Sequence, residues 1–379
     1  MQKTGMYIHI PFCKQKCLYC DFPSFAGQEC MQKGYVEALC RELEKKAKEL
    51  EEYEIESVFF GGGTPTVLSV DMLESLMQTI FSKYHIAPDA EITIEANPGT
   101  LDLAMCQSLR KMGFNRLSMG LQAWQESLLQ RLGRIHSRQM FLENFANAKK
   151  AGFHNINIDL MFALPKQTMA DWEETLINVM ALQPSHISVY SLIIEEGTPF
   201  YEYYQNGHYK EIDEETDRAM YRMAVEKLEL AGFHQYEISN FAIEGKQSCH
   251  NKRYWLDAEY MGYGLAAHSY WKGERFHNPY DMAIYMQRAE QGMGCREDIE
   301  MVSLEEQYGE FMFLGLRLME GVEKKRFSRR FGIPIEDVFA KAIEKTKAEG
   351  LLEEVDGFLR LTKRGIDLSN QVFLEFLPD

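Results

Sequence analysis

Residues 7–20 read YIHIPFCKQKCLYC, and this stretch decides how the rest of the chain can be interpreted. It places three thiols, Cys13, Cys17 and Cys20, at C-x3-C-x2-C spacing in a short loop directly after an apolar strand. Thiolates are the usual protein ligands of iron–sulfur clusters. Three cysteines from one loop leave one iron of a [4Fe-4S] cluster without a protein ligand. The spacing therefore predicts a [4Fe-4S] cluster whose open iron can hold a chelating small molecule.

A zinc site and three unrelated thiols are the alternatives. Structural zinc normally needs four protein ligands, and the next cysteine, Cys30, comes ten residues after Cys20. His9 is a further candidate ligand, but it alternates with Tyr7 in the expected strand and would face the interior of the fold. We therefore favour the iron–sulfur cluster and leave zinc open.

The composition is that of a large folded protein. The 379 residues are 45% hydrophobic and 26% charged, which allows two or three domains, or one barrel with an appendage. The net charge of −16 argues against a general nucleic-acid binder, because affinity for phosphates comes from Lys and Arg. Eight cysteines are too few for a disulfide scaffold in a chain of this length. Reduced iron–sulfur chemistry needs a reducing compartment, so we expect a cytoplasmic protein.

The N-terminus lacks the apolar core of a signal peptide, because His9, Pro11 and Cys13 interrupt it. The sequence has no run of about 18 apolar residues, so we expect no transmembrane helix. Peripheral association with a membrane and a homodimer both stay open.

Strands alternate with helices through the first 231 residues. We expect strands over 6–12, 57–60, 91–96, 116–121, 156–162 and 186–193. Helical periodicity or helix-forming composition marks 31–50, 71–83, 102–112, 138–151, 170–182 and 213–231. Six such repeats predict a parallel sheet. Periodicity alone leaves open whether the sheet is doubly wound or curved into a partial barrel.

Glycine or polar residues follow these strands, at the edge where parallel sheets bind ligands. The second strand ends in GGGTPT (61–66), and consecutive glycines let the backbone approach a ligand closely. The other strand ends supply EANP (95–98), Gly120 to Gln122, Asp159 and, after the sixth strand, Ile193. Singly, each is compatible with a turn, a helix cap or a salt bridge. Five in succession favour one ligand site.

Longer motifs extend this pattern over most of the chain. Besides residues 7–20 they are GGGTPT (61–66), EANP (95–98), SMGLQ (118–122), RLGR (131–134) and NIDL (157–160). Together they resemble the family of oxygen-independent coproporphyrinogen oxidases, within the radical S-adenosylmethionine (SAM) superfamily. The segment CHNKRYW (249–255) contains an HNxxYW motif and resembles the HemW branch of that family, the heme chaperones.

The resemblance implies an incomplete (β/α)6 barrel that binds the cluster, SAM on its open iron, and heme for delivery to heme-accepting proteins. By motif, Tyr7, Tyr19, Gly62 and Glu95 would contact that SAM. Other residues match positions that surround a second SAM in the oxidases: Gly63, Thr64, Gln122, Arg134 and Asp159. Ile193 is counted with these ligand-contacting residues. For Arg134, a surface position at the end of a helix is an equal alternative.

Three histidines lie in the aromatic-rich region after residue 240: His250, His268 and His277. Imidazole is a common axial ligand of heme iron. Because the HNxxYW motif contains His250, we expect His250 to bind heme, with Cys249 as a less favoured iron ligand. For His268 and His277 we favour a structural role in an aromatic core.

Two departures from the oxidases put porphyrinogen decarboxylation in doubt. The oxidases extend the cysteine motif to a fourth cysteine, whereas this chain has Phe22, which we expect to pack against the barrel. Only twelve residues precede Cys13, so the N-terminal extension of the oxidases is missing. Whether the chain is an enzyme stays open, with coproporphyrinogen III dehydrogenase as the alternative function.

We expect a barrel domain over 1–240 and a C-terminal region over 241–379, with a winged-helix-like module from about residue 303. Helices over 303–319 and 335–349 would precede a hairpin over 351–361 that turns at Asp356-Gly357. Five basic residues within 324–330 suggest DNA binding. The acidic chain and the resemblance instead favour packing or docking to a protein partner, without nucleic acid.

Overall fold

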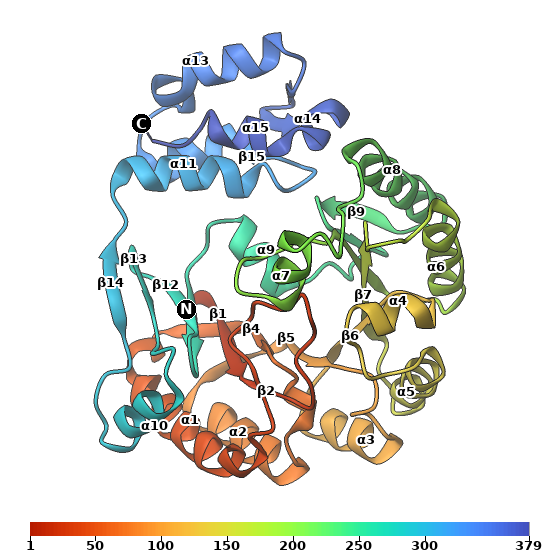
Figure 1. Cartoon of the computed structure of the whole chain (residues 1–379). Helices are drawn as coiled ribbons and strands as arrows, with labels where there is room; N and C mark the ends of the chain where they lie inside the picture. Colours follow the sequence, from red (N-terminus) through yellow and green to blue (C-terminus); the bar gives the residue numbers. More distant parts are fainter. Residues whose placement is uncertain (379) are drawn as a thin grey trace.

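A sheet of twelve strands organises the computed structural model, which describes residues 1–378 (Figure 1). Its central strands are parallel and lie in chain order. They are β1 (Gln2–Ile10), β4 (Tyr53–Gly62), β5 (His85–Ala96), β6 (Arg116–Gln122), β7 (Asn155–Phe162) and β8 (His186–Ser191). Each strand is added beside the preceding one, without the reversal of order that defines a doubly wound sheet. The order thus resolves the question that periodicity left open, in favour of an incomplete (β/α)6 barrel.

Helices that follow these strands in the chain cover the outer side of the curved sheet (Figure 1). They are α1 (Gln32–Lys46), α2 (Val70–Lys83), α3 (Leu103–Lys111), α5 (Arg138–Lys150), α6 (Met169–Ala181) and α8 (Glu214–Leu230). All six predicted strand–helix repeats are confirmed. Strand β6 is buried at every position, as expected for a parallel strand covered on both faces.

The sheet continues past residue 240. On one side, β10 (Asn240–Ala242) pairs antiparallel with β8 and with β9 (His234–Glu237). On the other, β11 (Tyr260–Tyr263) pairs parallel with β1, and further antiparallel strands follow it. These are β12 (His268–Trp271), β13 (Glu274–His277) and β14 (Glu297–Met301). The division predicted at residue 240 therefore does not coincide with a break in the sheet, because strands of only three to five residues gave no signal in the sequence.

Several short elements position the site. The two-residue strands β2 (Phe12–Cys13) and β3 (Phe25–Ala26) flank the cysteine loop and pair with each other. A 3-10 turn, η3 (Pro65–Val67), follows β4, and the other two 3-10 turns are η1 (Glu29–Met31) and η2 (Ala47–Leu50). The short helices are α4 (Glu126–Arg131), α7 (Pro199–Gln205), α9 (Cys249–Trp255) and α10 (Met282–Glu290).

The C-terminal module has its own hydrophobic core, which includes Phe311, Phe327, Leu359 and Phe376. Its elements are α11 (Leu304–Gly315), β15 (Val322–Glu323), α12 (Lys324–Phe331), α13 (Ile335–Ala348), β16 (Leu352–Val355), β17 (Phe358–Leu361), α14 (Lys363–Asp367) and α15 (Ser369–Leu374). Helices followed by a hairpin confirm the winged-helix-like module. The first helix ends four residues earlier than predicted, and the basic segment is itself a helix. Within residues 1–378, no helix is both long and apolar enough to cross a membrane.

The basic residues of α12 are mostly used within the protein. Arg326 donates to the carbonyl of Leu256, and Arg330 donates to the carbonyl of Asp257 at 2.9 Å. Arg330 also forms an ion pair of 2.7 Å with the Asp257 carboxylate, whose side chain is 2% exposed. These two arginines therefore hold the C-terminal end of α9. Side chains that are committed to the protein are not free to bind phosphates, which supports a packing role over DNA binding.

We predict that Arg330→Gln destabilises the protein much more than Arg329→Gln does. The first change leaves the buried Asp257 carboxylate without its partner, at a cost on the order of 3 kcal/mol in the free energy of unfolding. Arg329 lies in the same helix but is exposed and pairs only with Glu323 at 2.9 Å, so its loss should cost about 1 kcal/mol or less. Urea denaturation of both variants measures the difference. If both variants lose the same free energy of unfolding, Arg330 does not stabilise the C-terminal end of α9 in this way.

Candidate cluster and ligand site

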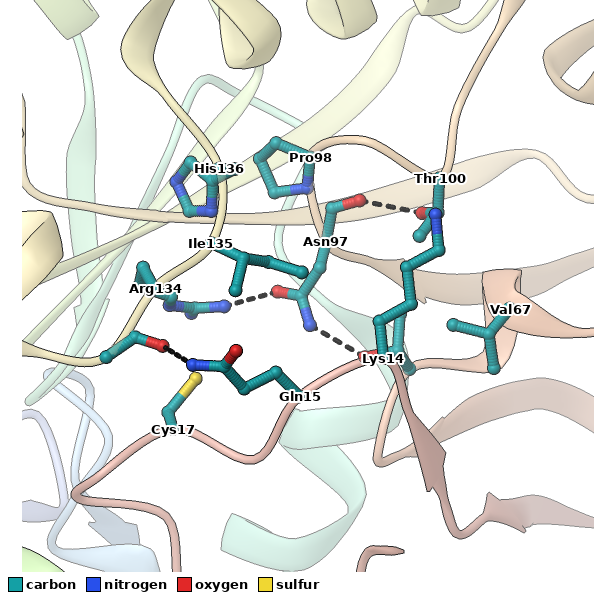
Figure 2. A pocket seen from close by; sticks show the side chains of 12 residues that line it. Lys14, Gln15, Cys17, Val67, Asn97, Pro98, Thr100, Arg134, Ile135 and His136 are labelled. Atoms are coloured by element: carbon teal, nitrogen blue, oxygen red, sulfur yellow. Dashed lines mark hydrogen bonds between the residues drawn. The ribbon is translucent and has the colours of Figure 1, made fainter. Parts of the chain in front are cut away.

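The cysteine loop is held by the segment that follows α4. The amide of Leu18 donates to the carbonyl of Leu132 at 3.1 Å. Gln15 Nε2 donates to the carbonyl of Gly133 at 2.9 Å, the bond drawn from Gln15 in Figure 2. Gly133 has φ +72°, and a Cβ added there would come within 2.7 Å of Leu18 Cγ. Only glycine allows both this backbone conformation and this close approach. The RLGR motif thus fixes the loop.

Cys13, Cys17 and Cys20 line one pocket of about 140 Å³, and none of them forms a disulfide. Within residues 1–378, no three His, Cys, Asp or Glu side chains converge on a point that could hold a single metal ion. Three thiols spread around a pocket suit a cluster of several irons. Burial raises the pKa values of the Cys13 and Cys20 thiols, so a positively charged metal centre is needed to keep them as thiolates.

The two candidates for a fourth zinc ligand are His9, which is hydrogen-bonded to other protein groups, and Cys30, which lies outside the pocket. His9 is 3% exposed, its Nδ1 is hydrogen-bonded to the Tyr7 hydroxyl at 3.0 Å, and its Nε2 contacts the Pro23 carbonyl at 2.8 Å. Cys30 is exposed and does not line the pocket. The donor set therefore fits a cluster with three protein thiolates better than a closed zinc site.

The glycine turn after β4 packs against strand β1 and the loop. Gly62 has φ +105°, and a Cβ there would come within 2.6 Å of His9 Nδ1. The amide of Gly63 donates to the Ile10 carbonyl at 2.9 Å, and the amide of Thr64 donates to the Phe12 carbonyl at 2.8 Å. Gly62 lines the pocket, as predicted, but its missing side chain makes room for an imidazole and not only for a ligand.

Arg134 lines the cysteine pocket and is partly exposed, so its contact with a ligand stays a prediction. Its Nη1 donates to Asn97 Oδ1 at 2.6 Å (Figure 2). Asn97 Nδ2 in turn donates to Thr64 Oγ1 at 2.7 Å, and that hydroxyl lies 3.5 Å from Cys13 Sγ. Asn97 was not among the predicted site residues, although the EANP motif after the third strand was the available signal.

Two partly buried carboxyl groups, those of Glu95 and Asp159, face the same space. Burial, and next the charge of Asp159, raise the pKa of Glu95 to about 8, against a hydrogen bond from the Gly62 amide that lowers it. Burial also raises the pKa of Asp159, which accepts hydrogen bonds from Asn157 at 2.7 Å and Ser118 at 3.2 Å. Near neutral pH, Glu95 is therefore mostly protonated, and a cationic ligand beside it would favour its ionised form.

Gln122 and the two predicted tyrosines complete the walls. Gln122 has φ +71° and accepts a hydrogen bond from the hydroxyl of Tyr190 at 2.9 Å. Tyr190 also lines this pocket, and it was not among the predicted site residues. Its place one residue before the end of β8 was the available signal. Tyr19 lies under the Arg134 guanidinium, 6.0 Å from it, and Tyr7 lies on Phe59 with ring centroids 6.3 Å apart.

A second pocket of about 250 Å³ adjoins the first and shares Phe22, Gly62, Glu95, Ser118 and Asp159 with it. It extends into the barrel as far as α9 and is also lined by Tyr7, Phe59, Arg116, Asn157, Ser188, His250, Asn251 and Tyr254. The HNxxYW motif therefore faces the interior of the barrel.

His250 is 1% exposed, and both of its ring nitrogens are engaged. Nδ1 lies 3.0 Å from Ser57 Oγ, and Nε2 lies 2.8 Å from the Tyr254 hydroxyl. Burial, and next the charge of Arg253, lower its pKa to about 3, so the ring is neutral. Ligation of heme iron by His250 stays a prediction, and it requires one of these hydrogen bonds to break.

Two other residues do not lie where the sequence predicted. Ile193 is 67% exposed and lines neither pocket, because β8 ends at Ser191, so the structure does not bring it together with the other site residues. Phe22 does not pack into the barrel but is 59% exposed at the two pockets. In the aromatic region, His268 contacts the Tyr280 hydroxyl at 2.9 Å, and His277 contacts Asp298 at 3.0 Å.

Comparison with known proteins agrees with this geometry. The Radical SAM superfamily model matches residues 7–177, and the HemN C-terminal domain model matches residues 302–368. The chain is 39% identical to the heme chaperone HemW of Bacillus subtilis over 98% of this chain and 99% of that protein. It is 32% identical to HemW of Escherichia coli over 99% and 98% of the two chains. The structure of coproporphyrinogen III oxidase (HemN) from Escherichia coli superposes with a TM-score of 0.86 at 22% identity, covering 99% of this chain and 90% of that one.

We predict that Gly133→Ala loosens the cysteine loop. The added Cβ meets Leu18, so the loop must move and the thiols should react faster with a water-soluble alkylating reagent. Gly152→Ala is the matched control, because Gly152 also has positive φ, +91°, but a Cβ there meets no atom within 4 Å. Residue-resolved mass spectrometry measures the labelling of Cys13, Cys17 and Cys20. Equal rates in the two variants would show that Gly133 does not hold the loop.

Proposed function

Because the chain belongs to the HemW family of heme chaperones within the radical SAM superfamily, we propose that it binds one [4Fe-4S] cluster, SAM and heme and delivers heme to acceptor proteins. The observation that carries this proposal is the pocket that three free thiols share with Gly62, Glu95, Arg134 and Asp159. The candidate cluster ligands and most of the residues that match SAM-binding positions line this one pocket, which supports a composite site.

Cys13, Cys17 and Cys20 would hold the cluster. When bound, such a cluster offers its open iron to the amino and carboxylate groups of SAM and can supply an electron. The protein contributes a loop fixed by Leu132 and Gly133, and a hydroxyl, Thr64 Oγ1, beside the Cys13 sulfur. Hydrogen bonds to thiolate sulfur tune iron–sulfur centres. Three free thiols and a cluster need a reducing environment, so the proposal places the protein in the cytoplasm.

Glu95 and Asp159 suit a positively charged ligand such as the sulfonium of SAM. Their raised pKa values reflect buried carboxyl groups without a full charge partner, and a cation in the pocket would supply one. Tyr7 and Tyr19 supply aromatic surface on either side of the open space. Whether SAM is cleaved or only bound does not alter this charge argument.

Loss of a cluster ligand should remove the metal. We predict that Cys13→Ala, Cys17→Ala and Cys20→Ala each lose most iron and acid-labile sulfide after anaerobic reconstitution. Cys30→Ala, an exposed thiol ten residues from the loop, should keep wild-type iron content. Iron and sulfide assays with the absorbance of the cluster measure the effect. If all four variants load equally, the loop is not the source of the ligands.

The affinity for SAM should rise with pH between about 6 and 8. Glu95 has a raised pKa of about 8, so it is protonated at the acid end and ionises towards the basic end, where it attracts a cation. Glu95→Gln should flatten this dependence, because the amide does not titrate. Equilibrium binding of SAM to the cluster-loaded protein across this range tests the prediction. A Glu95→Gln variant with the pH dependence of the wild type would assign the effect to another group.

The alternative function is coproporphyrinogen III dehydrogenase. Phe22 occupies the position of the fourth cysteine of the oxidases and lies exposed at the ligand pockets. We predict no conversion of coproporphyrinogen III under anaerobic, reducing conditions with SAM, while heme binds and passes to an apoprotein acceptor. Both are assayed on one cluster-loaded sample by porphyrin chromatography and heme absorbance. If the protein converts coproporphyrinogen III to protoporphyrinogen over multiple turnovers, its function is that of the dehydrogenase and not that of the chaperone.

A further inference from the structure

Arg116 is a buried cation whose hydrogen-bonding capacity is not used up by the protein. It is the first residue of β6, and its side chain is 2% exposed. Within residues 1–378, its Nε has no hydrogen-bond partner. The nearest acid is Glu91, whose Oε2 lies 3.9 Å from that nitrogen, too far for a hydrogen bond. A buried guanidinium left in this state is costly unless another group accepts from it.

Glu91 forms its hydrogen bonds with the start of α9 and not with Arg116. Its carboxylate accepts from Ser248 Oγ at 3.3 Å and from the amides of Cys249 and His250 at 3.1 and 3.2 Å. These contacts hold the N-terminal end of α9. Glu91 therefore offsets part of the charge of Arg116, but it does not satisfy the guanidinium donors.

Arg116 faces the pocket of about 250 Å³ inside the barrel. One wall of this pocket is a stack of nearly parallel rings. Tyr7 and Phe59 lie 6.3 Å apart and Phe59 and His250 lie 5.1 Å apart, each pair at an interplanar angle of 24°. The wall near Arg116 is polar, with Ser118, Asn157 and Ser188. Such a pocket suits a ligand with a flat apolar part and an acidic arm.

The neighbouring carboxyl groups do not exclude an anion. Glu95 and Asp159 line the same pocket, and burial raises both pKa values, that of Glu95 to about 8, while the charge of Arg116 lowers them. In the protein without bound SAM, Glu95 is therefore mostly protonated near neutral pH, and a protonated carboxyl group donates a hydrogen bond to an anion and does not repel it.

We propose that Arg116 binds a carboxylate arm of the ligand, and that this arm is a propionate of heme. The proposal rests on the proposed function. Guanidinium pairs with carboxylate through two parallel hydrogen bonds, which is the geometry that an unsatisfied arginine offers. Pockets that enclose whole ligands measure roughly 300–1,000 Å³. This pocket is therefore large enough for the arm and an edge of the ring only, and the remainder of the macrocycle extends towards the exposed Phe22.

Titration with hemin and with hemin dimethyl ester tests this assignment. The ester keeps the ring and the iron but has no carboxylates. Wild-type protein should bind hemin roughly 10- to 100-fold more tightly than the ester, the range for a hydrogen bond to a charged group. Arg116→Gln should bind both porphyrins equally, at the affinity of the wild type for the ester. Arg116→Lys keeps the charge without the bidentate geometry and should retain only part of the preference.

Arg110→Gln is the control for loss of a partly buried guanidinium, because Arg110 lies on α3 and donates to the Phe114 carbonyl away from both pockets. It should keep the full preference for hemin. An Arg116→Gln variant that still prefers hemin overturns the proposal, as does a wild type that does not distinguish the two porphyrins. Unchanged hemin binding with loss of SAM affinity in Arg116→Gln would also overturn it, since the carboxylate would then belong to SAM. Absence of any hemin binding by the wild type would instead defeat the proposed function.

Discussion

The site depends on a loop that has no regular structure of its own. Residues 14–20 carry two of the three thiols, and their backbone groups are held by contacts with other segments rather than within a helix or a sheet. Leu18 donates to Leu132, Gly63 to Ile10 and Thr64 to Phe12. Each bond ties a loop or strand end to its neighbour at one edge of the barrel. Because buried backbone groups must be paired, these bonds fix where the thiols lie before any metal binds.

The barrel order makes this arrangement possible. Parallel strands that follow one another in chain order bring all their C-terminal ends to one edge. GGGTPT, EANP, SMGLQ and NIDL are far apart in the sequence, yet their residues line one continuous space around the thiols. The same space is lined by buried or partly buried carboxyl groups and arginines, whose charges are only partly balanced by the protein. A site of this kind gains stability when charged ligands enter it.

Most of the fold could be predicted from the sequence, because alternation of strands and helices and the glycine turns are local signals. The six repeats and the hairpin at Asp356-Gly357 follow from such signals. The strands after residue 240 could not be predicted in this way, since β11 owes its place to parallel pairing with β1, some 250 residues away in the chain. In the site, the cysteines and strand ends were found by motif. The differences at Ile193 and Phe22 concern side-chain direction, which depends on where each strand stops and how the next loop leaves it.

The helix α9 connects the barrel pocket to the C-terminal module. It has seven residues, too few for a stable helix by itself, so its position is set by its neighbours. Glu91 of the barrel accepts hydrogen bonds from its N-terminal end, and Arg326 and Arg330 of the module donate to carbonyls at its C-terminal end. A carboxylate at the N-terminus and cations at the C-terminus both match the helix dipole. His250 and Tyr254 lie between these two sets of hydrogen bonds and line the ligand pocket. The basic segment of α12 and a wall of the ligand pocket are thus connected through this one short helix.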